Sequence, residues 1–121
     1  MMIRQGEVFW LDLETPRGSE PGGRRPFVVV QNNLFNRSRI HTIAVCAITS
    51  NLKRAGAPGN VLLRAGEAGL PKPSVVNISQ IYAVDREYFD DSVGHLSSER
   101  LSDVLAGVRL LIEPREVDES S

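Results

Sequence analysis

The chain has 121 residues, of which 41% are hydrophobic and 24% charged, and its net charge at pH 7 is −1. This length and composition are typical of one folded domain, and the near-neutral charge argues against nucleic-acid binding over the whole surface. No apolar run approaches the roughly 18 residues of a membrane helix. Residues 1–5 also lack the apolar core of a secretory signal, so we expect a cytoplasmic protein without a membrane partner.

Positive charge is concentrated in the first half of the chain. Residues 1–60 contain eight arginines and lysines against four acidic residues, whereas the remainder contains six against eleven. Most of the eight lie in three predicted loops, 13–25, 32–41 and 50–59. If these loops lie on one side of the molecule, they form a track for a polyanion; scattered, solvated charge is the alternative.

The predicted elements are mostly short strands. Apolar and β-branched runs predict strands at 7–13, 26–31, 41–48, 60–63, 74–78 and 82–85, with a last extended piece at 89 and 93–96. The pattern also allows helical turns at 34–39 and at 79–80, and the Gly- and Pro-rich segment 64–73 is expected to be a loop. Pro26 is expected to be the first residue of its strand, because it has no N–H. About six or seven closely spaced strands predict a small barrel or a twisted, mostly antiparallel sheet.

One helix is predicted near the C-terminus. Ser97 suits its N-cap, and apolar residues recur at helical spacing from Leu101 to Ile112, so one face should pack on the sheet. Pro114 should end the helix. We therefore expect a single, mainly β (α+β) domain over residues 1–114 and a short, disordered acidic tail at 115–121.

Motifs of metal-dependent and nucleotide-dependent enzymes are absent from the sequence. His41 and His95 are far apart and lack a cysteine or acidic cluster at metal-ligand spacing. There is no glycine-rich phosphate loop and no nucleophile elbow, so no cofactor is expected. The single cysteine, Cys46, lies in an apolar run and is predicted to be a core residue.

Two strand ends carry the remaining candidates for chemistry. Arg24 and Arg25 lie where the second strand begins, and Thr49 and Ser50 lie where the third ends. If these strands are antiparallel neighbours, Arg25 and Thr49 meet at one rim, below the loop that carries Glu20. Such a rim suits cleavage of an RNA phosphodiester: Arg25 would stabilise charge, Thr49 would donate a hydrogen bond, and Glu20 would be the base for the 2′-hydroxyl. A surface loop with solvated arginines is the alternative reading.

Four blocks of the sequence form a recognisable set: GEVFWLDL at 6–13, GSEPGGRRP at 18–26 with its valine strand and Gln31-Asn32, AITS at 47–50, and SVVNISQI at 74–81. Together they resemble the MazF/PemK family of toxins from bacterial toxin–antitoxin pairs, over about residues 3–112. The resemblance implies an SH3-like barrel with a C-terminal helix, assembled as a homodimer. It also implies metal-independent, sequence-specific cleavage of single-stranded RNA that leaves a 2′,3′-cyclic phosphate and a 5′-hydroxyl. An antitoxin with an acidic and apolar C-terminal tail would lie in the RNA groove.

The resemblance also assigns residues. The essential arginine and threonine of the family fall on Arg25 and Thr49, and the loop glutamate matches Glu20. The plasmid PemK-like branch has a catalytic Arg and Asp where this chain has Asn77 and Ser79, so the mechanism built on Arg25 and Thr49 is preferred. The residues assigned to RNA binding are Arg24, Gln31, Asn32, Ser50, Lys53, Arg54, Asn77 and Gln80.

Two other classes of function stay open. The first is a gyrase-directed toxin of the CcdB group, which shares this fold. That activity depends on a tryptophan near the C-terminus, whereas the only tryptophan here is Trp10, which is predicted to be core. The second is a non-catalytic RNA-binding module.

Overall fold

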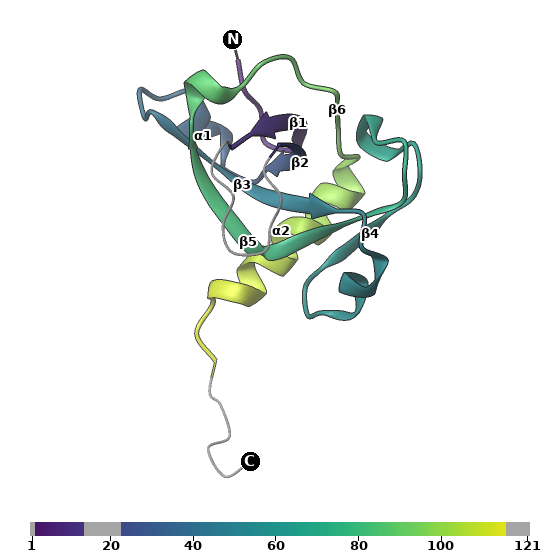
Figure 1. Ribbon diagram of the computed structural model, residues 1–121. Helices are drawn as coiled ribbons and strands as arrows, with labels where there is room; N and C mark the ends of the chain where they lie inside the picture. The colour runs from purple at the N-terminus through teal and green to yellow at the C-terminus, as the bar shows by residue number, and fades with distance from the viewer. Residues whose placement is uncertain (1, 14–22, 116–121) are drawn as a thin grey trace.

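The computed structural model describes residues 2–13 and 23–115. Six strands form one sheet in the order β4–β5–β3–β2–β1–β6, and each of its neighbouring pairs is antiparallel. The strands are β1 (Glu7–Asp12), β2 (Arg24–Val29), β3 (Thr42–Thr49), β4 (Val61–Leu63), β5 (Ser74–Asp85) and β6 (Gly94–His95). The sheet curls strongly (Figure 1), and the predicted antiparallel sheet with a C-terminal helix is confirmed.

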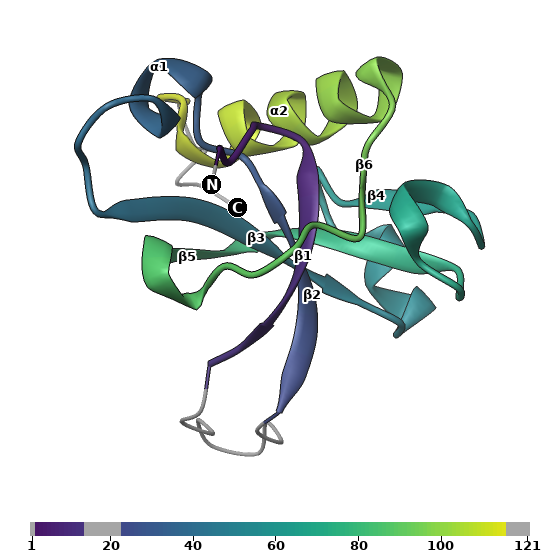
Figure 2. The ribbon, with the colours of Figure 1, turned by 90° about the horizontal axis from the view of Figure 1, so that it is seen from above.

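Helical segments connect and cover the strands. They are α1 (Asn33–Asn36), α2 (Ser98–Ile112) and the 3₁₀ turns η1 (Leu52–Gly56), η2 (Glu67–Gly69) and η3 (Arg86–Tyr88). Figure 2 shows α2 lying across one side of the sheet, while the β1–β2 hairpin extends away on the other side. No helix in the described part of the chain is long and apolar enough to cross a membrane.

Alternate residues of the strands belong to two apolar clusters, one on each face of the sheet. Val28, Cys46 and Ile48 belong to the cluster that packs against α2, where Val104 is fully buried. Neighbouring strand residues face the other way and form a second cluster around Phe9, Phe27, Val29, Val45 and Phe89. This alternation is the period of two expected of strands. The core position predicted for Cys46 is confirmed, and burial raises the pKa of its thiol to about 12.

The prediction of two strands at 74–78 and 82–85 is wrong, because β5 is one strand with a bulge. Cys46 pairs with Ile81, but its neighbour Ala47 pairs with Asn77, so residues 78–80 have no paired residue in the ladder with β3. The helical turn predicted at 79–80 is this bulge. Residues in a bulge leave the ladder without ending the strand, and here the Ile78 N–H donates instead to Asn60 Oδ1 over 3.0 Å.

Pro26 was predicted to be the first residue of its strand, but it is the third. It lies opposite Trp10 on β1, and the pairing of β2 with β3 begins only at Phe27. At Pro26, β2 therefore pairs with β1 but not yet with β3, and a missing N–H is tolerated at such an edge position.

The C-terminal helix begins as predicted, since Ser97 Oγ accepts a hydrogen bond from Arg100 N over 3.1 Å. Its last turn differs from the prediction. Leu111 and Ile112 are 46% and 71% exposed and do not pack on the sheet. The reason is that α2 extends past the edge of the sheet (Figure 1).

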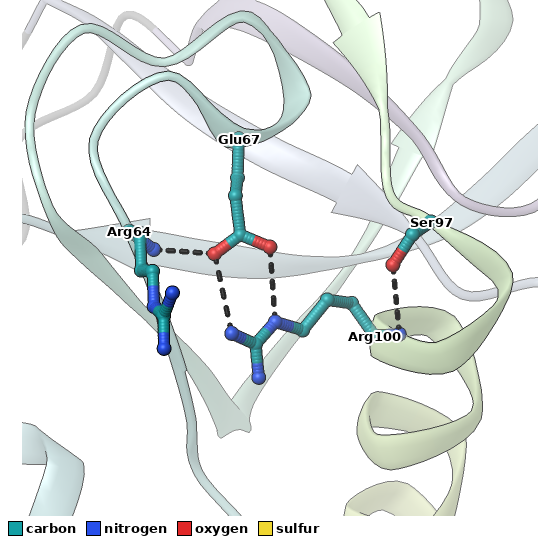
Figure 3. A network of polar contacts seen from close by, with 4 residues as sticks. All are labelled: Arg64, Glu67, Ser97 and Arg100. Carbon is teal, nitrogen blue, oxygen red and sulfur yellow. Dashed lines mark hydrogen bonds and ion pairs between the residues drawn. The ribbon is translucent and has the colours of Figure 1, made fainter.

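The predicted loop 64–73 contains η2 and is tied to the start of α2 (Figure 3). Glu67 accepts from Arg100 Nε over 2.9 Å and from Arg100 NH2 over 3.4 Å, and it also accepts from the backbone N–H of Arg64. The hydrogen bonds from Arg100 and then from Arg64 lower the pKa of Glu67. The loop is thus held in place just before it continues to Lys72 and β5.

Candidate active site

A groove of about 780 Å³ opens between the β1–β2 hairpin, the end of β3 and the two halves of β5. Arg25, Phe27, Ala47 and Thr49 line it from the face of the sheet turned away from α2, because the residues that alternate with them belong to the α2 cluster. The polar residues along it include Arg25, Thr49, Ser50, Asn51, Arg54, Lys72, Asn77 and Gln80.

Arg25 and Thr49 lie on adjacent strands at one rim of this groove. Phe27 pairs with Ala47 across β2 and β3, and continuing this antiparallel register by two residues places Arg25 opposite Thr49. Both residues are half-buried and line the groove. Thr49 Oγ1 accepts a hydrogen bond from Asn51 N over 3.1 Å, which turns the hydroxyl hydrogen away from Asn51.

Half of the eight residues predicted to bind RNA line this groove. Ser50, Arg54, Asn77 and Gln80 line the groove together with Arg25 and Thr49. The exposed residues Arg24 and Lys53 lie beside it, on β2 and η1. Glu20, the predicted base, lies outside the described residues.

Gln31 and Asn32 are not brought to the groove. Gln31 Nε2 donates to Thr42 O over 3.0 Å, and Gln31 Oε1 accepts from Ala44 N over 3.1 Å. Asn32 caps α1, because its Oδ1 accepts from Leu34 N over 2.8 Å. Both residues hold the corner at the end of the β2–β3 ladder that lies away from the groove.

The condition for one cationic track, that the three loops lie on one side, is not met by loop 32–41. That loop precedes β3, whereas loop 50–59 follows it, so the two loops lie at opposite ends of the same strand. Arg37 and Arg39 are therefore separated from Arg54 by the length of β3.

Sequence reasoning missed several groove residues. Lys72 lies in the wall just before β5. Trp10, predicted to be core, is half-buried; it packs against the α2 cluster and also lines the groove. Lys72 was detectable in principle: Thr49 pairs with Val75, so the start of β5 lies beside the end of β3. The strand-end argument made for β2 and β3 also applies to β3 and β5.

The groove combines positive charge with aromatic rings. Among its described lining residues, Arg25, Arg54 and Lys72 are cationic and Asp85 is acidic. Aromatic side chains come from Trp10, Phe27, Tyr82 and Tyr88, and the rings of Phe27 and Tyr82 meet edge to face with centroids 5.7 Å apart. Cations that follow a phosphate backbone and rings that stack on bases are the means by which proteins hold single-stranded nucleic acid. Within residues 2–13 and 23–115, no three His, Cys, Asp or Glu side chains form a possible metal site.

The protein is thus a small, curled antiparallel half-barrel with a C-terminal helix, and its groove has the cationic and aromatic lining that suits a single-stranded polyanion. Residues 4–112 match the family described as PemK-like, MazF-like toxin of type II toxin–antitoxin system, and the chain belongs to this family. The resemblance stated from the four sequence blocks is thereby confirmed.

Curated relatives cover nearly the whole chain. The endoribonuclease MazF6 of Mycobacterium tuberculosis is 38% identical over 113 residues, which are 93% of this chain and 99% of that protein. The endoribonuclease EndoA of Bacillus subtilis is 36% identical over 104 residues, 86% of this chain and 89% of that protein.

Solved structures agree in fold. The crystal structure of MazF from Deinococcus radiodurans superposes with a TM-score of 0.73 at 26% identity, over 93% of this chain and 97% of that one. A mycobacterial endoribonuclease in complex with its cognate antitoxin superposes with a TM-score of 0.75 at 20% identity, over 94% and 99% of the two chains. At this lower identity the comparison supports the fold alone.

Proposed function

We propose that this chain is the toxin of a type II toxin–antitoxin pair and that it cleaves single-stranded RNA in the cytoplasm as a sequence-specific endoribonuclease. Residues 1–114 form the toxin domain in this proposal. The observation that carries it is the placement of Arg25 and Thr49 on adjacent strands at the rim of a cationic, aromatic groove. Family membership and the endoribonuclease activity of the curated relatives support the same reaction.

The proposed reaction is a transesterification that needs no metal. The 2′-oxygen of the RNA attacks the adjacent phosphorus while the bond to the 5′-oxygen breaks, which leaves a 2′,3′-cyclic phosphate and a 5′-hydroxyl. Glu20 takes the 2′-hydroxyl proton, and the leaving 5′-oxygen takes a proton from solvent water. Arg25 stabilises the charge that builds up on the phosphate oxygens, and Thr49 donates a hydrogen bond to one of them.

The groove also suits the antitoxin. An acidic and apolar tail would pair with Arg25, Arg54 and Lys72 and cover the aromatic side chains, so it would exclude RNA by occupying the same site. One chain in the crystal structure of MazE–MazF from Deinococcus radiodurans is 25% identical to this one, with a TM-score of 0.73.

A second copy of the chain is the remaining partner in this proposal. Leu110, Leu111 and Ile112 at the end of α2 are 39%, 46% and 71% exposed, and exposed apolar clusters of this kind mark interaction surfaces. Light scattering should give twice the mass of one chain, and the double substitution Leu111→Glu with Ile112→Glu should shift the protein to the monomer.

The test of the proposed function is incubation of purified protein with a long, mixed-sequence RNA in EDTA, followed by mapping of the new ends. We expect cuts at one short motif with 5′-hydroxyl ends. Arg25→Ala should lower the rate by about 10²–10³, the usual loss for one transition-state donor. The pH–rate profile of Glu20→Gln then tests the base.

Two results would contradict the proposal. Equal cleavage by wild type and by folded Arg25→Ala would overturn the assignment of Arg25 to the mechanism. A folded, antitoxin-free protein that makes no cuts would overturn the endoribonuclease. Gyrase inhibition or tight binding of intact RNA would then identify which alternative class applies.

A further inference from the structure

Asn60 ties η1 to the bulge of β5 through three hydrogen bonds. Its Nδ2 donates to Arg54 O over 2.9 Å and to Asn77 Oδ1 over 3.3 Å, and its Oδ1 accepts from Ile78 N over 3.0 Å. A backbone carbonyl can only accept and a backbone N–H can only donate. These two backbone partners therefore determine which end of the Asn60 amide is nitrogen.

The orientation of Asn77 follows from that of Asn60. Because Asn60 presents a hydrogen, the atom of Asn77 that faces it must be the oxygen. Ser79 Oγ donates to the same Oδ1 over 3.1 Å. The Nδ2 group of Asn77 is thus the end turned away from this network, and no hydrogen bond to it occurs within the described ranges. Asn77 is only 7% exposed, yet it lines the groove.

Asn77 lies close to the two proposed catalytic residues. Thr49 pairs with Val75, and Asn77 lies two residues further along β5, opposite Ala47. Asn77 and Thr49 are therefore diagonal neighbours on one face, with Cα atoms about 7–8 Å apart. Arg25 follows on the next strand. A phosphate group that lies between these side chains can accept a hydrogen bond from each of them, because each such bond spans about 3 Å between donor and acceptor.

We propose that Asn77 is a further catalytic residue, whose Nδ2–H donates to a non-bridging oxygen of the scissile phosphate. This inference rests on the proposed endoribonuclease function. Negative charge on those oxygens grows as the 2′-oxygen attacks, so a donor held in place beforehand stabilises the transition state more than the bound substrate. Asn77 is neutral, and its contribution depends on the orientation that Asn60 imposes.

Two substitutions distinguish the loss of the Asn77 Nδ2 donor from the loss of the hydrogen bonds that Asn77 makes to Asn60 and Ser79. Asn77→Asp keeps an oxygen for Asn60 and Ser79 and replaces only the NH₂ group, whereas Asn77→Leu removes the donor without adding charge. On a short RNA that contains the mapped cleavage motif, we expect kcat to fall by about 10²–10³ in both variants. KM should stay near wild type in Asn77→Leu and rise in Asn77→Asp, because a carboxylate repels phosphate.

A stereochemical readout distinguishes this contact from a structural role. A donor aimed at one non-bridging oxygen makes the enzyme discriminate between the Rp and Sp phosphorothioates at the cleaved position. We expect the wild type to discriminate and both variants to change that preference, whereas Arg25 and Thr49 keep their own contacts to the phosphate. Loss of kcat with an unchanged preference would show that Asn77 acts only through the fold.

Asn33→Asp is the matched control. Asn33 Oδ1 also accepts two hydrogen bonds, from Gln5 N over 2.8 Å and from Asn36 Nδ2 over 3.1 Å, but at the far end of the ladder. The Asn33→Asp variant should cleave as the wild type does.

If the wild type cleaves and both folded Asn77 variants cleave within about threefold of it, the inference is wrong and the proposed function stands. If Asn77→Leu does not fold, the isosteric Asn77→Asp decides. If the wild type itself does not cleave, the proposed function fails and the inference with it.

Discussion

Arg86 Nε donates to the carbonyl oxygen of Ile40 over 2.6 Å, across 46 residues of sequence. The Arg86 NH2 group reaches three further carbonyls of the same corner, those of Asn36 at 2.8 Å and of Phe35 and Ser38 at 3.3 Å. One guanidinium therefore joins the end of β5 to the turn between α1 and β3. This corner holds the end of the ladder that lies away from the groove.

The first prediction concerns the stability of this corner. Arg86→Leu should lower the free energy of unfolding by about 2–3 kcal/mol, because several carbonyls lose a charged donor. Urea denaturation of wild type and variant measures this change in the free energy of unfolding. The exposed Arg39 in the same corner supplies the control, and Arg39→Leu should change stability by less than about 0.5 kcal/mol. Equal effects of the two substitutions would show that the Arg86 contacts contribute nothing specific.

The second prediction concerns the hydroxyl of Thr49. Thr49→Val keeps the shape of the side chain and removes the oxygen, so single-turnover cleavage should fall by about 10² or more while the unfolding free energy changes little. In an Arg25→Ala background the same change should cause a much smaller further loss, because residues that act together are not additive.

Thr42→Val is the control for this change, since Thr42 is half-buried at the other end of β3. It should cleave at the wild-type rate. Wild-type cleavage by Thr49→Val would remove the hydroxyl from the mechanism.

The third prediction is a pH dependence of stability. Hydrogen bonds from Arg100 and Arg64 lower the pKa of Glu67 from its ordinary value of 4.5. A lowered pKa means that the contact stabilises the fold above pH 4.5 and loses this contribution as the pH falls through the folded-state pKa. Glu67→Gln should thus reduce stability by about 1 kcal/mol at pH 7 and by progressively less below pH 4.5.

Unfolding curves of wild type and Glu67→Gln across this pH range measure the effect. Replacement of the exposed Glu87 by Gln controls for the loss of a carboxylate as such. A difference between wild type and Glu67→Gln that stays constant into acid would contradict the assignment to this ion pair.

The fourth prediction concerns the contact between α2 and the turn before β4. A Cβ at Gly107 would lie 2.3 Å from the carbonyl oxygen of Gly59. Gly107→Ala should therefore destabilise the protein by about 1–3 kcal/mol, although alanine favours a helix by about 1 kcal/mol over glycine. The reverse change at the exposed neighbour, Ala106→Gly, should cost only about 1 kcal/mol. A stabilised Gly107→Ala variant would show that the turn moves freely away from the helix.

The rim of the site was predictable because it depends on a local rule. Two strands that follow one another along the chain usually pair, and antiparallel pairing brings the start of one beside the end of the other. Arg25 and Thr49 followed from this rule alone. Gln31 and Asn32 were assigned to RNA from their position in a family block, whereas their hydrogen bonds to Ala44 and Leu34 hold a corner.

The sequence by itself determined the strand-rich architecture, the N-cap at Ser97, the buried Cys46 and the family, because these depend on periodicity and on residues near one another in the chain. Only the tertiary structure decided that β5 continues through a bulge and that Asn60 orients Asn77. These features depend on hydrogen bonds and packing between segments far apart in the sequence. Such contacts form only when the sheet curls, and no local pattern of residues specifies them.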